Sequence, residues 1–238
     1  MKNHVLFYDY WHQSTNSQEI AFYAHYAQQT DGPILELGCG TGRLLLPLAH
    51  AGYHIEGLDI DATMLALCTK KAADQKIPVT LHQQSISSLY LQKKYALIIS
   101  ALETFQHITD YQEVKKALNA IYTHLTNNGT LLIYLSLPWL YAPKNASTWR
   151  MINRTIRDKK QYTLHEKSIH DPLEQLYHHT YQIKEDNHII HEYKTEIRWY
   201  ARHEFETLLR QSGFNTITVQ SGYNSDGPFD CMIFIACK

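Results

Sequence analysis

Gly38, Gly40 and Gly42 alternate with other residues between a short apolar run and a predicted helix. Glycines let the backbone turn sharply and approach a ligand without a clash from a Cβ atom. The start of the following helix points free N–H groups at that ligand. Glu36 stands just before the loop, where its carboxylate would repel a pyrophosphate. The segment therefore predicts a site for a ligand that carries an ammonium group and lacks phosphate.

The spacing of these glycines argues against a dinucleotide site. A loop that binds NAD carries the pattern G-x-G-x-x-G. Here the third glycine comes one residue earlier, and Arg43 stands in the place of the last glycine of that pattern. We therefore disfavour a nucleotide-dependent oxidoreductase.

Asp59 ends a second predicted strand, which runs over 54–58. A carboxylate at the carboxyl end of such a strand can accept hydrogen bonds from both hydroxyls of a ribose. By itself, Asp59 could equally open a solvated turn. Together with the glycine loop it favours a nucleoside ligand.

Strands and helices alternate along the first 137 residues, which is typical of right-handed βαβ units and a parallel sheet covered on both faces. A turn is expected at Asn128 and Gly129. The expected strands are 34–37, 54–58, 79–83, 95–101 and 130–137, and the expected helices are 17–30, 43–51, 62–75 and 110–125.

The pattern changes in the following segment. Residues 176–183 and 189–199 alternate in polarity around a turn at 184–187, which predicts an antiparallel hairpin with one aromatic face. A helix over 201–211 and strands over 214–220 and 232–236 follow. We therefore expect a single domain over 1–238, in which 140–199 is an antiparallel β insertion that serves as a substrate subdomain.

The chain resembles the class I S-adenosylmethionine-dependent methyltransferases in three stretches: ILELGCGTGR (34–43), GLDID (57–61) and HQQSISSL (82–89). The resemblance covers 17–137 well and 200–238 more loosely. It implies a Rossmann-like α/β fold with seven mostly parallel strands in the order 3-2-1-4-5-7-6, helices on both faces, and an antiparallel strand seven. It also implies S-adenosylmethionine as cofactor, S-adenosylhomocysteine as product, and the small-molecule branch of the family.

The resemblance assigns roles to individual residues. The backbone around Gly38 and Gly40 would hold the methionine moiety, and Asp59 would bind the ribose. The family often has an acidic residue where Ser85 stands, so the adenine contact there would come from a neutral hydroxyl, and a shift by one residue to Gln84 is an alternative. The full set implied for the cofactor is Glu36, Gly38, Cys39, Gly40, Asp59, Ile60, Met64, Ser85, Ile86 and Ala101.

Methyl transfer is an in-line displacement that needs an aligned and deprotonated nucleophile. His107 follows the fourth predicted strand and is the first candidate for a base, because the ordinary pKa of histidine lies near neutral pH. Glu103 is the second candidate. Alternatively, His107 caps or packs against the next helix.

Residues of the insertion are candidates for the pocket of the methyl acceptor. Their aromatic face could instead pack on the main sheet or on another subunit, so a homodimer is compatible with the sequence. The candidates are His165, Tyr177, His179, Tyr181 and Arg198.

The composition limits the partners. The chain has 238 residues and a formal net charge of -1, which gives no electrostatic reason to expect nucleic acid or an anionic membrane surface. No histidines have the spacing of a metal site, so we expect no metal. We expect no signal peptide and no membrane span. Four cysteines without a CxxC pair are interpreted as reduced thiols, so we expect the cytoplasm.

The aromatic run at 7–11 is unusual for a free N-terminal tail. It could close over the cofactor or simply pack against the first long helix. The sequence as a whole predicts transfer of a methyl group to a nitrogen or oxygen of a small molecule. The alternative is a binding protein that keeps the cofactor site without turnover, for example a sensor or a subunit of an assembly.

Overall fold

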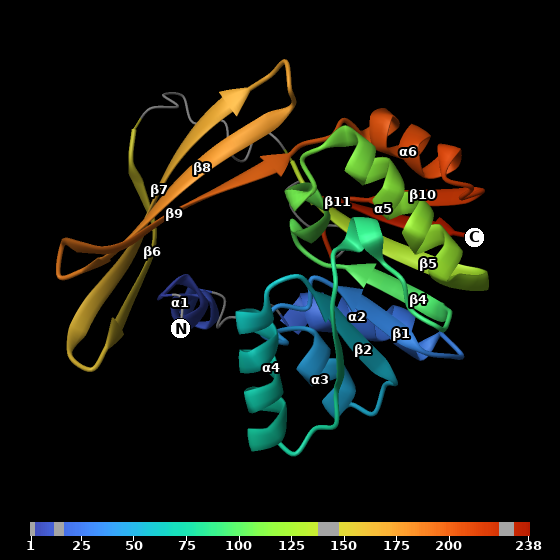
Figure 1. Ribbon diagram of the computed structural model, residues 1–238, viewed down its shortest axis with the longest axis horizontal. Coiled ribbons are helices and arrows are strands. Elements are labelled where there is room, and N and C mark those ends of the chain that lie inside the picture. The colour runs from blue at the N-terminus through green and yellow to red at the C-terminus, as the bar shows by residue number, and fades with distance from the viewer. Residues whose placement is uncertain (1–2, 12–16, 138–147, 224–230) are drawn as a thin grey trace.

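The computed structural model describes residues 3–11, 17–137, 148–223 and 231–238. They form a seven-stranded sheet flanked by helices and a separate four-stranded antiparallel sheet (Figure 1). The first sheet has the order β10-β11-β5-β4-β1-β2-β3, which confirms the expected order. Strand β11 runs antiparallel to both β10 and β5, whereas the other neighbouring strands pair in parallel. Its strands are β1 (Ile34–Leu37), β2 (Ile55–Asp59), β3 (Thr80–Gln83), β4 (Tyr95–Ser100), β5 (Leu125–Ser136), β10 (Thr216–Gln220) and β11 (Cys231–Cys237).

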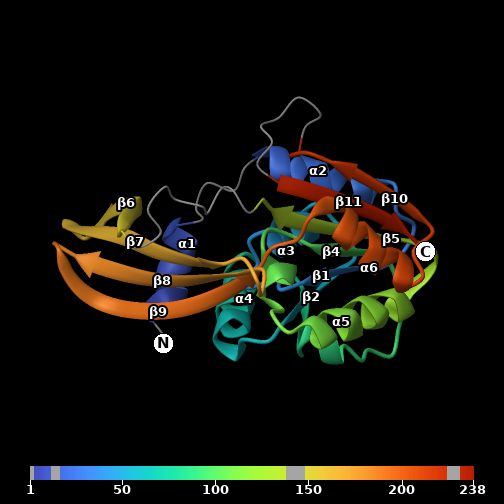
Figure 2. The same cartoon turned by 90° about the horizontal axis from the view of Figure 1, so that it is seen from above.

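Helices cover both faces of this sheet (Figure 2). Asp61 begins one of them by accepting a hydrogen bond from the Thr63 N–H at 2.7 Å, and Asp110 begins another by accepting from Gln112 and Glu113. The helices of this part are α2 (Ser17–Gln28), α3 (Leu45–His50), α4 (Ala62–Asp74), α5 (Tyr111–His124) and α6 (Arg202–Gln211), with 3₁₀ turns η1 (Ile86–Ser88) and η2 (Thr104–His107).

The central strands are buried on both sides. In β4, Leu97 and Ile99 pack with α2, α3 and α4, whereas Ile98 packs with α5 and α6. Successive side chains of a strand point to opposite faces, so a doubly covered strand must be apolar at every position. The continuous apolar run in the sequence is therefore explained by two separate core clusters.

Two local expectations need correction. The helix expected over 43–51 begins at Leu45, so Pro47 lies in its first turn, where a missing N–H costs no helical hydrogen bond. The turn expected at Asn128 and Gly129 is an irregularity inside β5, which already begins at Leu125. Asn128 adopts a φ of 65°, and this local kink lets the strand continue.

The second sheet lies within the expected insertion, and the residues at 140–147 of that insertion fall outside the described part. Its hairpin has the predicted aromatic face, because Tyr181 lies opposite Tyr193 and Tyr177 opposite Ile197. Two further strands complete the sheet in the order β6-β7-β8-β9. The strands are β6 (Arg150–Arg157), β7 (Lys160–Asp171), β8 (Leu176–Glu185) and β9 (His188–Arg198).

Helix α1 (Asn3–Trp11) lies against the second sheet and reaches the glycine loop (Figures 1 and 2). Its Phe7 packs on Tyr162 with ring centroids 5.0 Å apart. Its Asp9 accepts hydrogen bonds from Thr41 at 2.5 Å and from Lys71 at 3.1 Å. The aromatic N-terminal segment therefore connects the second sheet to the glycine loop and α4. Among the described helices, none is long and apolar enough to cross a membrane.

Candidate active site

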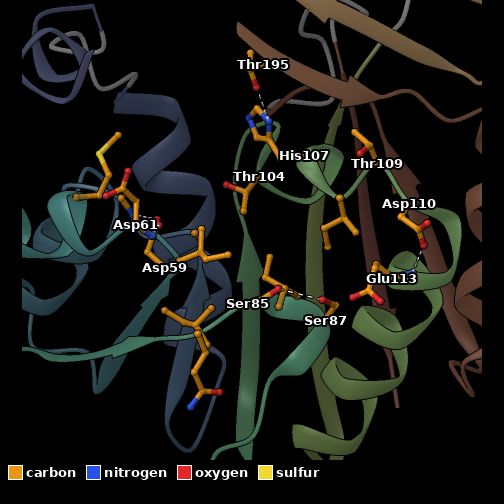
Figure 3. A pocket seen from close by; sticks show the side chains of 18 of the residues that line it. Asp59, Asp61, Ser85, Ser87, Thr104, His107, Thr109, Asp110, Glu113 and Thr195 are labelled. Atoms are coloured by element: carbon orange, nitrogen blue, oxygen red, sulfur yellow. Dashed lines mark hydrogen bonds between the residues drawn. The ribbon is translucent and has the colours of Figure 1, made fainter. Parts of the chain in front are cut away.

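Two adjoining cavities lie at the carboxyl ends of the parallel strands. The first cavity, of about 740 Å³, is lined by residues that follow β1, β2, β3 and β4 (Figure 3). The second cavity, of about 570 Å³, lies between the glycine loop and the second sheet. Both are lined by Tyr8, Gly38, Met64, Thr104, His107 and Thr195.

The glycine loop requires glycine for two different reasons. Gly38 has a φ of 66°, and a Cβ there would lie 2.2 Å from the Thr104 side chain. Gly40 has a φ of 54°, but its added Cβ would meet no described atom within 4 Å. Gly38 thus permits close packing, whereas Gly40 leaves open space beside the backbone, as a cradle for a ligand would.

Asp59 holds this loop in place. One of its carboxylate oxygens accepts from the Gly40 N–H at 2.8 Å, and the other accepts from the Asp61 N–H at 2.8 Å. Burial raises the pKa of Asp59, and these two hydrogen bonds oppose that effect. Asp59 also lines the first cavity, and each oxygen keeps acceptor capacity, so the contact with a ribose stays a prediction.

Glu36 is a buried carboxyl group at the wall of the second cavity. Glu36 is a residue of β1 and is 3% exposed. Its Oε2 has no hydrogen-bond partner among the described residues. Burial raises the pKa of Glu36 to about 8, although the nearby Arg43 guanidinium lowers it. An unpaired buried acceptor of this kind suits a ligand that donates hydrogen bonds and carries positive charge.

Arg43 and Glu19 are site-forming residues that the sequence reasoning missed. Arg43 donates to both oxygens of Glu19 on α2, one of them at 2.9 Å, and it also contacts Tyr8 of α1. This fixes two helices against the glycine loop. Nothing in the local sequence pattern indicates that Glu19 and Arg43, which are 24 positions apart, form an ion pair.

The first cavity contains the residues expected at the adenine. Ile60, Met64, Ser85 and Ile86 all line it. Ser85 Oγ lies 3.0 Å from Ser87 Oγ (Figure 3). Both Gln84 and Ser85 reach the cavity, but the Gln84 amide is engaged at both ends by the backbone of Tyr90. Ser85 is therefore the better placed of the two alternatives.

Asp110 and Glu113 also line the first cavity, and sequence reasoning did not single them out (Figure 3). They come from the beginning of α5. Their only sequence signal was the pattern of a helix start, in which acidic residues have an ordinary structural role.

His107 is accessible in the cleft and lines both cavities. Its Nδ1 lies 3.2 Å from the Glu196 carbonyl oxygen and 3.2 Å from Thr195 Oγ1. A carbonyl only accepts, so Nδ1 carries the hydrogen and Nε2 keeps a lone pair. Desolvation lowers the pKa of His107 more than the charge of Glu103 raises it, which favours the neutral base near pH 7. Asp110, and not His107, caps α5.

Gln106 fixes the segment that carries His107. It is fully buried, and its Oε1 accepts from the Ser136 N–H at 2.7 Å and the Ser136 hydroxyl at 2.9 Å. Its Nε2 donates to the Arg198 carbonyl at 3.0 Å, and Arg198 in turn donates to the Thr109 carbonyl at 2.8 Å. These bonds join η2 to the ends of β5 and β9.

The second cavity has aromatic and apolar walls with a few polar groups. Cys39, Ala101 and Glu103 line it from the first sheet. Of the expected insertion residues, His179 and Tyr181 belong to its lining, whereas His165, Tyr177 and Arg198 are outside it in the described structure. Its further lining includes Trp11, Ile152, Asn153, Leu164, Tyr193, Lys194 and Ile197. Within the described residues, no group of three acidic, histidine or cysteine side chains could hold a metal ion.

Comparison with known proteins agrees with this geometry. Residues 34–129 match the family described as "Methyltransferase domain". The chain is 28% identical over 110 residues to a ubiquinone biosynthesis O-methyltransferase of Rickettsia canadensis, covering 46% of this chain and 45% of that protein. It is 26% identical over 112 residues to a dTDP-3-amino-3,6-dideoxy-alpha-D-glucopyranose N,N-dimethyltransferase of Streptomyces fradiae, covering 47% and 41%. The matches thus span less than half the length of these relatives.

A solved S-adenosylmethionine-dependent methyltransferase from Clostridium acetobutylicum ATCC 824 superposes with a TM-score of 0.79 at 18% identity, covering 97% of this chain and 95% of that one. The likeness shows that the whole fold is shared. Residues 34–129 are thus similar to a methyltransferase domain, and the chain as a whole shares its fold with a solved S-adenosylmethionine-dependent methyltransferase.

Proposed function

We propose that the chain transfers a methyl group from S-adenosylmethionine to a nitrogen or oxygen atom of a small molecule. The observation that carries this proposal is the buried, unpartnered Oε2 of Glu36 beside a glycine loop that leaves room for a ligand. A cationic, phosphate-free nucleoside satisfies both features, whereas a pyrophosphate would meet the carboxyl group of Glu36.

The two cavities would bind different parts of the reacting molecules. The adenosine part would lie in the first cavity, with Ile60 and Met64 beside the base, Ser85 and Ile86 at its edge, and Asp59 at the ribose. The ammonium group would face Glu36 at the junction with the second cavity. When bound, the cofactor supplies an electrophilic methyl group on a positively charged sulfur.

The second cavity would hold the methyl acceptor. Its volume of about 570 Å³ and its closure by the second sheet favour a small molecule over a polymer. The two relatives named above are, by their names, enzymes of ubiquinone and amino-sugar chemistry, which supports the same size class. They act at oxygen and at nitrogen respectively, so the attacking atom stays open between the two.

His107 and Glu103 would prepare the acceptor. The lone pair on His107 Nε2 can take up a proton or hold a hydrogen-bond donor in either cavity, and Glu103 lies in the second one. The aromatic walls would exclude water and align the nucleophile, which alone can supply much of the rate. The cytoplasmic location remains a prediction from the sequence.

Calorimetric titration with S-adenosylmethionine, S-adenosylhomocysteine and NAD tests the cofactor. We expect both adenosyl ligands to bind and NAD not to bind. Turnover of the methyl donor with a panel of amines, amino acids and phenols then tests catalysis. Binding without turnover across the panel would favour the non-catalytic alternative, and uptake of NAD in place of both adenosyl ligands would contradict the proposal.

A further inference from the structure

A buried histidine and a buried glutamate form a pair in the wall that the second sheet contributes to the second cavity. His179 of β8 lines the cavity, and its side chain is 1% exposed. Its Nδ1 lies 3.1 Å from Glu166 Oε1 and 2.8 Å from Ser168 Oγ, both on the neighbouring strand β7. This pair belongs to the second sheet and is separate from His107 and Glu103.

Glu166 is ionised at neutral pH. Burial by itself would raise the pKa of Glu166, but hydrogen bonds from His179 and Arg150 lower it to about 2. The Arg150 Nε donates at 2.7 Å, and the Tyr181 hydroxyl donates to the other oxygen at 2.9 Å. A buried carboxylate with this many donors is held in one orientation.

The carboxylate decides which nitrogen of His179 carries the hydrogen. A lone pair on Nδ1 would face the negative charge of Glu166, so the hydrogen belongs on Nδ1, and Nε2 becomes the acceptor. The ring is also stacked between Tyr177 and Tyr181, with centroids 5.9 Å and 5.8 Å away. Its plane is thereby fixed within the wall of the cavity.

The position of this ring matches what in-line displacement requires. The nucleophile must point its electron pair at the methyl group, so its proton leaves on another side. Gly38 and Ala101 line the second cavity from the end of the first sheet, where the cofactor would bind, and His179, Tyr181 and Tyr193 line it from the second sheet. A base on the second sheet therefore faces the acceptor from the side away from the cofactor.

We propose that His179 takes up the proton of the methyl acceptor. Glu166 orients the His179 ring and balances the positive charge that the ring then carries. This inference rests on the proposed methyltransferase function. The hydrogen on the attacking nitrogen or oxygen forms a bond to Nε2 through the lone pair of that ring nitrogen. The electron pair of the broken bond stays on the attacking atom, and an electron pair of that atom forms the new bond to the methyl carbon. The bond between that carbon and the donor sulfur breaks at the same time, and its electron pair stays on the departing sulfur. The imidazolium formed is neutralised by Glu166 and later returns its proton to water.

The groups around His179 favour this role. His107 of η2 interacts with His179 electrostatically, and desolvation lowers the pKa of His107, which favours its neutral form. Thr195 lies opposite His179 on β9, and Lys194 lines the cavity from the same strand. Arg150 is a second cationic partner of Glu166 and balances its charge.

The same sheet supplies a matched control. His178, the next residue along β8, has its Nδ1 2.9 Å from Glu196 Oε1, but this pair is exposed on the other face. A His178→Gln variant removes an equivalent ion pair outside the cavity. Any general effect of losing a histidine from this sheet should appear in both variants.

The first test is nuclear magnetic resonance of the ¹⁵N-labelled protein, with and without S-adenosylhomocysteine, and needs no acceptor. We expect the hydrogen of the neutral His179 ring on Nδ1 in the wild type, and a loss of this preference for Nδ1 in Glu166→Gln. His178→Gln should leave the His179 signals unchanged. A hydrogen on Nε2 in the wild-type protein would overturn the inference, even if the variants failed to fold.

The second test is turnover of whichever amine, amino acid or phenol of the panel the wild type methylates. We expect His179→Gln to lower kcat by about 100-fold while binding of S-adenosylhomocysteine is retained, and Glu166→Gln to have a smaller effect in the same direction. If the kcat of His179→Gln equals that of the wild type, the inference is overturned, but the proposed function is not affected. Failure of the wild-type protein to bind S-adenosylhomocysteine would instead contradict the proposed function.

Discussion

The carboxylate of Asp59 accepts a hydrogen bond from the Gly40 N–H at 2.8 Å, which joins the end of β2 to the loop that follows β1. A residue expected to touch a ribose therefore also shapes the loop beside it. Asp59→Ala should lose this bond together with the bond from the Asp61 N–H. We expect the thermal shift caused by S-adenosylmethionine to disappear and stability to fall by about 1–3 kcal/mol.

Asp74→Asn is the control for Asp59→Ala, because Asp74 is exposed at the far end of α4. It should keep the full thermal shift, which for a ligand at one hundred times its Kd corresponds to about 2.7 kcal/mol. An undiminished shift in Asp59→Ala would show that Asp59 neither binds the ligand nor is needed to hold the loop.

Gly40→Ala should weaken cofactor binding more than it weakens the fold. The φ of 54° strains an alanine by about 1–2 kcal/mol, but the added Cβ meets no described atom within 4 Å. Gly52→Ala is matched to it, because Gly52 has a φ of 92° and the same open surroundings outside both cavities. Urea unfolding should show similar losses in the two variants, whereas calorimetry should show weaker binding only in Gly40→Ala. Equal cofactor affinities of Gly40→Ala and Gly52→Ala would contradict a ligand contact at Gly40.

Glu36 should make both stability and binding depend on pH. Its pKa is raised from 4.5 to about 8 by burial, so the folded protein binds the proton more tightly than the unfolded chain. Stability should therefore fall as the pH rises from about 4.5 to about 8, and Glu36→Gln should flatten this dependence. The measurement is urea unfolding across that pH range.

A ligand with an ammonium group should favour the ionised form of Glu36. Affinity for S-adenosylhomocysteine should then rise by up to about tenfold per pH unit below the pKa and level off above it, with release of a proton. Calorimetry in buffers of different ionisation enthalpy measures that proton. Binding of the wild type with no proton release at pH 7 would contradict the contact between Glu36 and the ammonium group.

Gln106→Leu should affect both the fold and the rate. It leaves the Ser136 N–H and the Arg198 carbonyl without their buried partner, which should cost at least about 2 kcal/mol in urea unfolding. Because His107 is the next residue, its displacement should lower kcat by up to about 100-fold with a smaller change in cofactor affinity. Gln112→Ala, at an exposed position of α5, should change neither. Unchanged kcat in a destabilised Gln106→Leu would limit Gln106 to a structural role.

Local patterns in the sequence determined the first sheet and its loop. The period of apolar residues, the glycine spacing and the carboxylates at strand ends are properties of neighbours in the chain, and they predicted the alternating strands and helices and the placement of Gly38 and Asp59 at one edge. The strand order and the place of Ser85 came from the resemblance to the methyltransferase family. The hairpin with its aromatic face was also predictable, because alternation has a period of two in a strand.

Only the tertiary structure decided how the two sheets and α1 enclose the second cavity. The ion pair of Arg43 with Glu19, the contact of Asp9 with Lys71 and the pair of His179 with Glu166 each join different elements of the fold. Histidine, glutamate and arginine are common on solvated faces, so their types alone give no sign of such partners. Burial and partner choice depend on the packing of whole elements, which no local pattern in the chain encodes.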